Sequence, residues 1–226
     1  MFVKSATSDS ASGPVCERIS EATSPSSMEL YFIRNDSEKS TLVSPNGLAH
    51  YQIFTTKGQP FGKPATTLIQ RCADPGVDEA IAEIEWKRWS HPIVKSNIFD
   101  GRNQELEVRE FLYKIGGSFS PKRYFLGNDN EEYRWMDVKD SGLMLCNRRT
   151  LEEVARFKLE VVRDGVFHGD KKWILRIQPT DLDIDLIVLS FIIILKRNPG
   201  ASGKEVPAYH DEEMTEGGCG EVSVAL

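Results

Sequence analysis

The chain has 226 residues, of which 40% are hydrophobic, and a formal net charge of −6, which suits one domain with a real core. Residues 28–200 hold 25 Lys+Arg and 25 Asp+Glu, so the acidic excess lies in the two terminal segments. A neutral body gives no electrostatic footprint for nucleic acid. The four cysteines are scattered without C-x-x-C spacing, which argues against a disulfide framework or a zinc site and favours reduced, cytoplasmic thiols.

The first 27 residues include eight Ser and two Thr and few large apolar side chains. This composition is typical of disorder, and it lacks the apolar stretch of a signal peptide. We therefore expect a disordered extension at 1–27, a folded domain at 28–198 and a disordered acidic tail at 199–226.

From residue 29 onward, short extended segments alternate with turns rich in Gly, Asn, Asp and Pro, and the stretch after the first segment is predicted to be a polar turn. The predicted strands are 29–34, 48–56, 65–71, 80–86, 91–99, 106–113, 122–126, 132–138, 143–147, 153–162 and 171–178. With no long amphipathic helix among them, they predict a mainly β, antiparallel domain of about twelve strands.

A helix is predicted at about 182–197, around the apolar run Leu186–Leu195. Three aspartates precede the run and Lys196-Arg197 follow it, which suits the helix dipole, and Thr180 with Asp183 has capping-box-like spacing. The β-branched residues in the run would also suit a buried strand. Ten residues cover roughly half of a bilayer core, so we expect no transmembrane span. We expect this helix to fill a closed barrel of about twelve strands.

The chain resembles a fungal family known only as domain of unknown function 6593, and more distantly the tubby C-terminal and phospholipid-scramblase-like barrels. The segments that carry the family resemblance are Tyr51–Thr56, Thr66–Ile69, Ile81–Trp86, Tyr133–Trp135 and Leu182–Val188. It implies a tubby-like barrel around a C-terminal hydrophobic helix. In tubby-like proteins a basic surface binds phosphoinositides, but the family supplies no catalytic residue to transfer.

Catalytic and metal motifs are not found in the sequence. Asp181-x-Asp183-x-Asp185 has Leu186 where a calcium loop needs Gly, so these acids are better explained as helix N-terminal residues. No His lies at metal-ligand spacing from another His or Cys, and no nucleophile-elbow or phosphate-loop motif occurs. The sequence therefore predicts no catalytic, metal or cofactor residue.

Pairs of adjacent basic residues recur along the chain, several of them at strand ends. They are Lys87-Arg88, Lys122-Arg123, Arg148-Arg149, Lys171-Lys172 and Lys196-Arg197. The first four pairs are the candidate residues for binding an anionic surface; the alternative is a mixed, solvated surface. The tryptophans at 86, 89, 135 and 173 could line a pocket, but core or cross-strand packing is the simpler explanation.

The leading hypothesis is a non-enzymatic module that binds an anionic lipid such as a phosphoinositide, or a protein partner, at the periphery of a membrane. An apolar small-molecule carrier and an unrecognised enzyme are the alternatives. A clustered basic face would favour lipid, and an open lumen beside the helix would favour a carrier.

Overall fold

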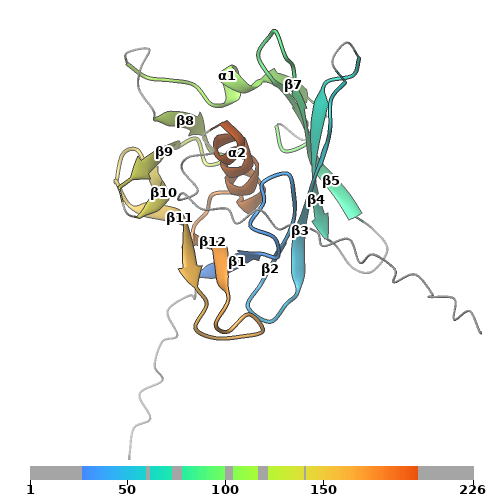
Figure 1. Ribbon diagram of the computed structural model, residues 1–226. Helices are drawn as coiled ribbons and strands as arrows, with labels where there is room; N and C mark the ends of the chain where they lie inside the picture. The colour runs from blue at the N-terminus through green and yellow to red at the C-terminus, as the bar shows by residue number, and fades with distance from the viewer. Residues whose placement is uncertain are drawn as a thin grey trace, which may run out of the picture.

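The structure, a computed structural model, describes residues 27–59, 62–72, 78–99, 104–116, 122–139 and 141–197 (Figure 1). The expectations for residues 1–26 and 199–226 lie outside these ranges. The elements are β1 (Met28–Phe32), β2 (Lys39–Val43), β3 (Ala49–Thr56), β4 (Ala65–Cys72), β5 (Asp78–Trp86), β6 (Ile93–Ser96), β7 (Gln104–Glu107), α1 (Val108–Phe111), β8 (Arg123–Leu126), β9 (Glu132–Val138), β10 (Gly142–Asn147), β11 (Glu153–Val161), β12 (Lys171–Ile177) and α2 (Ile184–Arg197).

All twelve strands form one antiparallel sheet in the order β7-β6-β5-β4-β3-β2-β1-β12-β11-β10-β9-β8. The first and last strands are neighbours in the middle of this order, with Met28 opposite Ile177. The two edge strands, β7 and β8, are linked in the chain through α1, and Tyr113 forms an isolated bridge with Tyr124 of β8. In the described part of the chain no ladder joins β7 to β8. The sheet is thus open in its pairing, and the closed barrel stays a prediction.

The sheet curves around α2, which lies in its concavity (Figure 1). Every α2 residue from Asp185 to Leu195 is buried, with exposed fractions of 5% or less. The ring of Phe191 packs against aromatic rings from three strands, at centroid distances of 4.7–6.0 Å. These rings are Phe32 of β1, Trp135 of β9 and Phe157 of β11. The predicted hydrophobic helix is confirmed, and it is the centre of the core.

The one polar side chain in the middle of α2 has its hydrogen bonds satisfied. Ser190 donates its hydroxyl hydrogen to the Ile187 carbonyl oxygen (3.0 Å) and accepts a bond from the Trp135 indole N–H (2.9 Å). Both groups are buried, so pairing avoids the cost of an unsatisfied polar atom. Among the described residues, no helix has the length and apolar character needed to cross a membrane.

The start of α2 differs in detail from the predicted capping box. The backbone N–H of Asp185 donates to the Asp183 carboxylate (2.9 Å), as expected for an N-cap residue just before Ile184. Thr180 instead accepts a bond from the N–H of Leu182 (3.1 Å), which closes a turn ahead of the helix. The cap is therefore Asp183, and the box between residues 180 and 183 was wrong.

Asp185 is a buried carboxylate that ties the first turn of α2 to two strands. Tyr51 of β3 donates its hydroxyl hydrogen to one carboxylate oxygen (2.8 Å), and Arg71 of β4 forms an ion pair with the other. Burial raises the pKa of Asp185, while Tyr51 and Arg71 act to lower that pKa. Burial also raises the pKa of the Tyr51 hydroxyl, and the neighbouring carboxylate raises it further. The sequence predicted only a helix-end charge here.

Two segments depart from the predicted strands. Residues 39–43, predicted to be part of a turn, form β2, in which Ser40 is buried and its hydroxyl donates to the Arg34 carbonyl oxygen. Residues 106–113, predicted to be one strand, divide into the end of β7 and α1. There Glu107 and Glu110 form a reciprocal capping box.

Candidate anionic-surface site

The C-terminus of α2 lies at one end of the sheet, which we call the helix-exit end. The antiparallel registers place the end of β5 beside the start of β4, and the end of β11 beside the start of β12. The Lys196 ammonium reaches this end, 3.4 Å from the Thr55 hydroxyl oxygen and 3.1 Å from a Glu38 carboxylate oxygen. Loops that follow β5, β9 and β11 therefore share an end with the last turn of α2.

Four of the five dibasic pairs occur at the helix-exit end. Lys87-Arg88 follow the last residue of β5, Lys122-Arg123 stand at the start of β8, and Lys171-Lys172 begin β12. Lys196-Arg197 are the last two residues of α2. Arg148-Arg149 lie in the turn between β10 and β11, at the opposite end.

The end of α2 connects three of these pairs. The Lys196 ammonium lies 5.0 Å from the ring centroid of Trp86, the residue directly before Lys87. Arg123 begins β8 at the same end of the sheet, and its charge adds to burial in lowering the pKa of Arg197. We call Lys87, Arg88, Lys122, Arg123, Lys196 and Arg197 the basic rim.

Lys171 and Lys172 also lie at the helix-exit end, but the contacts of Lys172 are with residues outside the basic rim. The Lys172 ammonium donates to the Ile33 carbonyl oxygen (3.0 Å), lies 3.5 Å from Asp170 and sits 5.2 Å from the ring centroid of Phe167. These contacts hold the β11–β12 loop, which gives Lys172 a structural role, while Lys171 is exposed.

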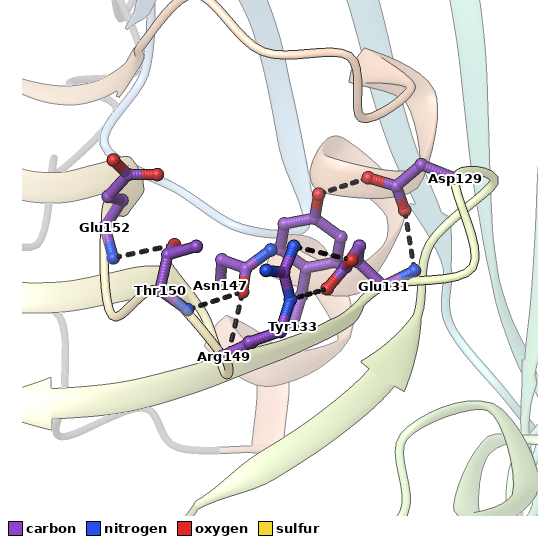
Figure 2. Close-up of polar contacts among 7 residues, drawn as sticks. All are labelled: Asp129, Glu131, Tyr133, Asn147, Arg149, Thr150 and Glu152. Atoms are coloured by element: carbon purple, nitrogen blue, oxygen red, sulfur yellow. Dashed lines mark hydrogen bonds and ion pairs between the residues drawn. The ribbon is translucent and has the colours of Figure 1, made fainter.

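Arg148-Arg149 are neutralised by neighbouring acids. Figure 2 shows the Arg149 guanidinium donating to both carboxylate oxygens of Glu131, at 2.8 and 3.2 Å. Arg148 pairs with Glu132. The bond from Arg149 lowers the pKa of Glu131, and bonds from Tyr113 and Arg148 lower the pKa of Glu132. This pair therefore belongs to a folded turn more than to an anion-binding surface.

For one tryptophan at the helix-exit end, the packing that the sequence favoured is wrong. Trp89, in the β5–β6 loop, is 90% exposed, whereas Trp135 and Trp173 are at most 5% exposed. The Arg88 guanidinium carbon lies 5.4 Å from its ring centroid. The sequence feature that could have predicted this exposure is that Trp89 has polar neighbours on both sides and lies in a predicted loop, where no strand face could bury it.

A groove of about 700 Å³ lies on the outer face of the sheet, under the β11–β12 loop. That loop folds back so that the Val166 N–H donates to the Pro45 carbonyl oxygen (3.2 Å). Polar groups in the groove pair with one another: Tyr31 donates its hydroxyl hydrogen to Glu29 (2.6 Å), and Arg176 pairs with the same carboxylate (2.7 Å). Burial and Glu29 raise the pKa of Tyr31 to about 12. These groups satisfy each other, and α2 fills the interior, so no observation here favours the carrier or the enzyme.

The fold defines the class: a mainly β domain with one curved twelve-stranded antiparallel sheet around a buried C-terminal helix. The chain belongs to a family of unknown function (DUF6593), whose model matches residues 35–198. No curated protein matches the chain. A solved structure of a protein from Arabidopsis thaliana is similar over 77% of this chain and 93% of its own, with 10% identity and a TM-score of 0.44. That likeness is too distant to bear on function.

Proposed function

We propose that this protein is a non-enzymatic module that attaches to the cytoplasmic face of membranes through anionic lipids, with the basic rim as its contact surface. The observation that supports the proposal is the position of three dibasic pairs at the helix-exit end of the sheet, where α2 ends. At the opposite end of the sheet, Arg148 and Arg149 pair with Glu132 and Glu131, and within the basic rim Lys196 pairs with Glu38.

Local charge has to supply the attraction, because residues 28–200 have no net charge. Each basic residue near an anionic membrane contributes about 1 kcal/mol, so four acting together give weak, reversible attachment. Binding fades with added salt, since the Debye length falls from about 10 Å at 0.1 M to about 3 Å at 1 M.

The contribution of the basic rim to membrane binding is tested with two separate double variants, each of which removes two cations from one end of the sheet. Lys87→Ala/Arg88→Ala is expected to weaken binding to phosphoinositide-bearing vesicles roughly 30-fold, the equivalent of about 2 kcal/mol. Arg148→Ala/Arg149→Ala removes the same formal charge and is expected to change binding less than about twofold. Co-sedimentation at low salt measures both.

Equal losses in the two variants would show that only total charge matters and would contradict the assignment to the basic rim. Equal sedimentation of the wild type with neutral and anionic vesicles would overturn the proposal as a whole and leave a protein partner as the better hypothesis.

The acidic tail is expected to oppose this binding. Residues 198–226 hold one Lys and six Asp+Glu, and in the sequence they follow Arg197, a residue of the basic rim with which α2 ends. Deleting 199–226 should strengthen vesicle binding severalfold at low salt, because the deletion removes negative charge that the anionic vesicle surface repels. Deleting 1–27 is the control, since β1 begins at the opposite end of the sheet. An unchanged affinity after tail deletion would contradict the expectation.

We also propose that the architecture is the tubby-like barrel that the sequence resembles. Twelve antiparallel strands in sequence-neighbour order around a C-terminal hydrophobic helix support this. The bridge between Tyr113 and Tyr124 supports closure through the segment after α1.

A further inference from the structure

Trp89 occupies an unusual position for a large aromatic side chain. It stands in the β5–β6 loop, 90% exposed, while the indole of Trp86 three residues earlier packs under Lys196 and donates to the Thr67 hydroxyl oxygen (2.7 Å). Folding therefore gains nothing from burying Trp89, and its indole is accessible to a binding partner.

The surroundings of Trp89 are cationic and polar. Lys87 and Arg88 precede it, with the Arg88 guanidinium carbon 5.4 Å from the ring centroid, and exposed Ser90 and His91 follow. A protein interface has a core in which several apolar side chains are buried together. A single indole among cations instead matches the boundary between lipid headgroups and acyl chains, where tryptophan is enriched and anionic headgroups meet basic residues.

We propose that Trp89 is an interfacial anchor whose indole inserts at the headgroup–acyl boundary of an anionic bilayer. The inference rests on the proposed function and specifies it: the partner is a bilayer, and not a soluble polyanion or a protein. Charge on the basic rim brings the domain to the surface, and the indole adds a contribution that salt does not screen.

The test uses the full chain with vesicles of phosphatidylcholine and phosphatidylserine, with and without acyl-brominated lipid. We expect a blue shift of tryptophan emission on binding and quenching by the brominated lipid, because Trp135 and Trp173 stay buried in the core and Trp86 packs under Lys196. Trp89→Ala should remove both signals and weaken vesicle binding about tenfold or more. Its binding to soluble inositol hexakisphosphate should stay within twofold of the wild type.

Leu48→Ala is the matched control, because Leu48 is 61% exposed in the β2–β3 hairpin at the opposite end of the sheet. It should leave vesicle binding and quenching unchanged. Vesicle binding by the wild type without quenching, or with no loss in Trp89→Ala, would overturn the anchor and leave the proposed function standing. Failure of the wild type to bind any anionic vesicle would overturn both.

Discussion

Phe191→Asp is expected to abolish the cooperative unfolding transition. Phe191 is fully buried against three aromatic rings, so the variant loses that packing and places a carboxylate among them, where the one N–H donor, that of Trp135, already bonds to Ser190. Loss of a buried Phe side chain costs about 3–5 kcal/mol, and an unpaired buried charge costs several more. The sum is comparable with the whole stability of a domain, about 5–15 kcal/mol.

Asp183→Asn is the control on the same helix. It keeps an acceptor for the Asp185 N–H and removes only charge, at a cost of about 0.3–1 kcal/mol. Denaturant titration measures both variants. Phe191→Ala, with an expected loss of about 3–5 kcal/mol, gives a readable value if the charged variant does not fold. A Phe191→Asp protein within 1 kcal/mol of the wild type would place α2 outside the core, in conflict with the structure.

Arg71→Met is expected to destabilise the fold most at neutral pH and least in acid. Its guanidinium is half-exposed, so the loss should be that of one charged hydrogen bond, about 1.5–3 kcal/mol, and not that of a fully buried ion pair. Burial already raises the pKa of Asp185, and Arg71 is one of the two groups that hold the pKa down. Removing Arg71 therefore raises the pKa further.

The direction of the pH effect follows from that rise. A carboxyl whose pKa is higher in the folded than in the unfolded state binds more protons when folded, so the free energy of unfolding falls as pH rises through the interval between the two values. The deficit of Arg71→Met relative to the wild type should be complete above the raised pKa of Asp185 in the variant and should vanish below the folded-state pKa of Asp185 in the wild type, since the unfolded value is common to both proteins.

Urea titrations from pH 4 to pH 8 measure this deficit. Glu79→Gln removes the other acid near Arg71, at 3.7 Å and half-exposed, and should change stability little at any pH. In the Asp185→Asn background, Arg71→Met should show no pH-dependent deficit. A deficit that grows on acidification would contradict the role given to Asp185.

The sequence predicted the helices and strands that can be recognised from the local order of apolar, polar and charged residues. The apolar run Leu186–Leu195 with its charged ends identified α2, and alternating segments identified most strands. It failed where a tertiary partner decides the outcome. β2 begins with three polar residues, and the burial of Ser40 is accommodated by a hydrogen bond from its hydroxyl to the Arg34 carbonyl oxygen. α1 was mistaken for strand because four residues are too few to reveal a helical period.

The candidate site shows the same division. Pairs of adjacent basic residues can be found in the sequence. Which end of the sheet each pair occupies depends on the strand register, which the sequence alone does not provide. The pairing of Asp185 with Arg71 spans 114 positions and has no local signature. Trp89 could be placed in a loop, although its exposure needed the structure.

The position of α2 also sets the order in which the chain can fold during synthesis. Phe32, Trp135 and Phe157 point inward from strands made early, in the middle and late, yet all of them contact a helix that is among the last parts of the domain to leave the ribosome. The β1–β12 pairing is similarly long-range, which slows folding because distant segments must meet first. At roughly 5–20 residues per second, about 8–30 seconds separate the synthesis of Phe32 from that of Leu195. Until residue 195 has emerged, the inward-facing rings of these strands lack the helix that covers them in the folded protein.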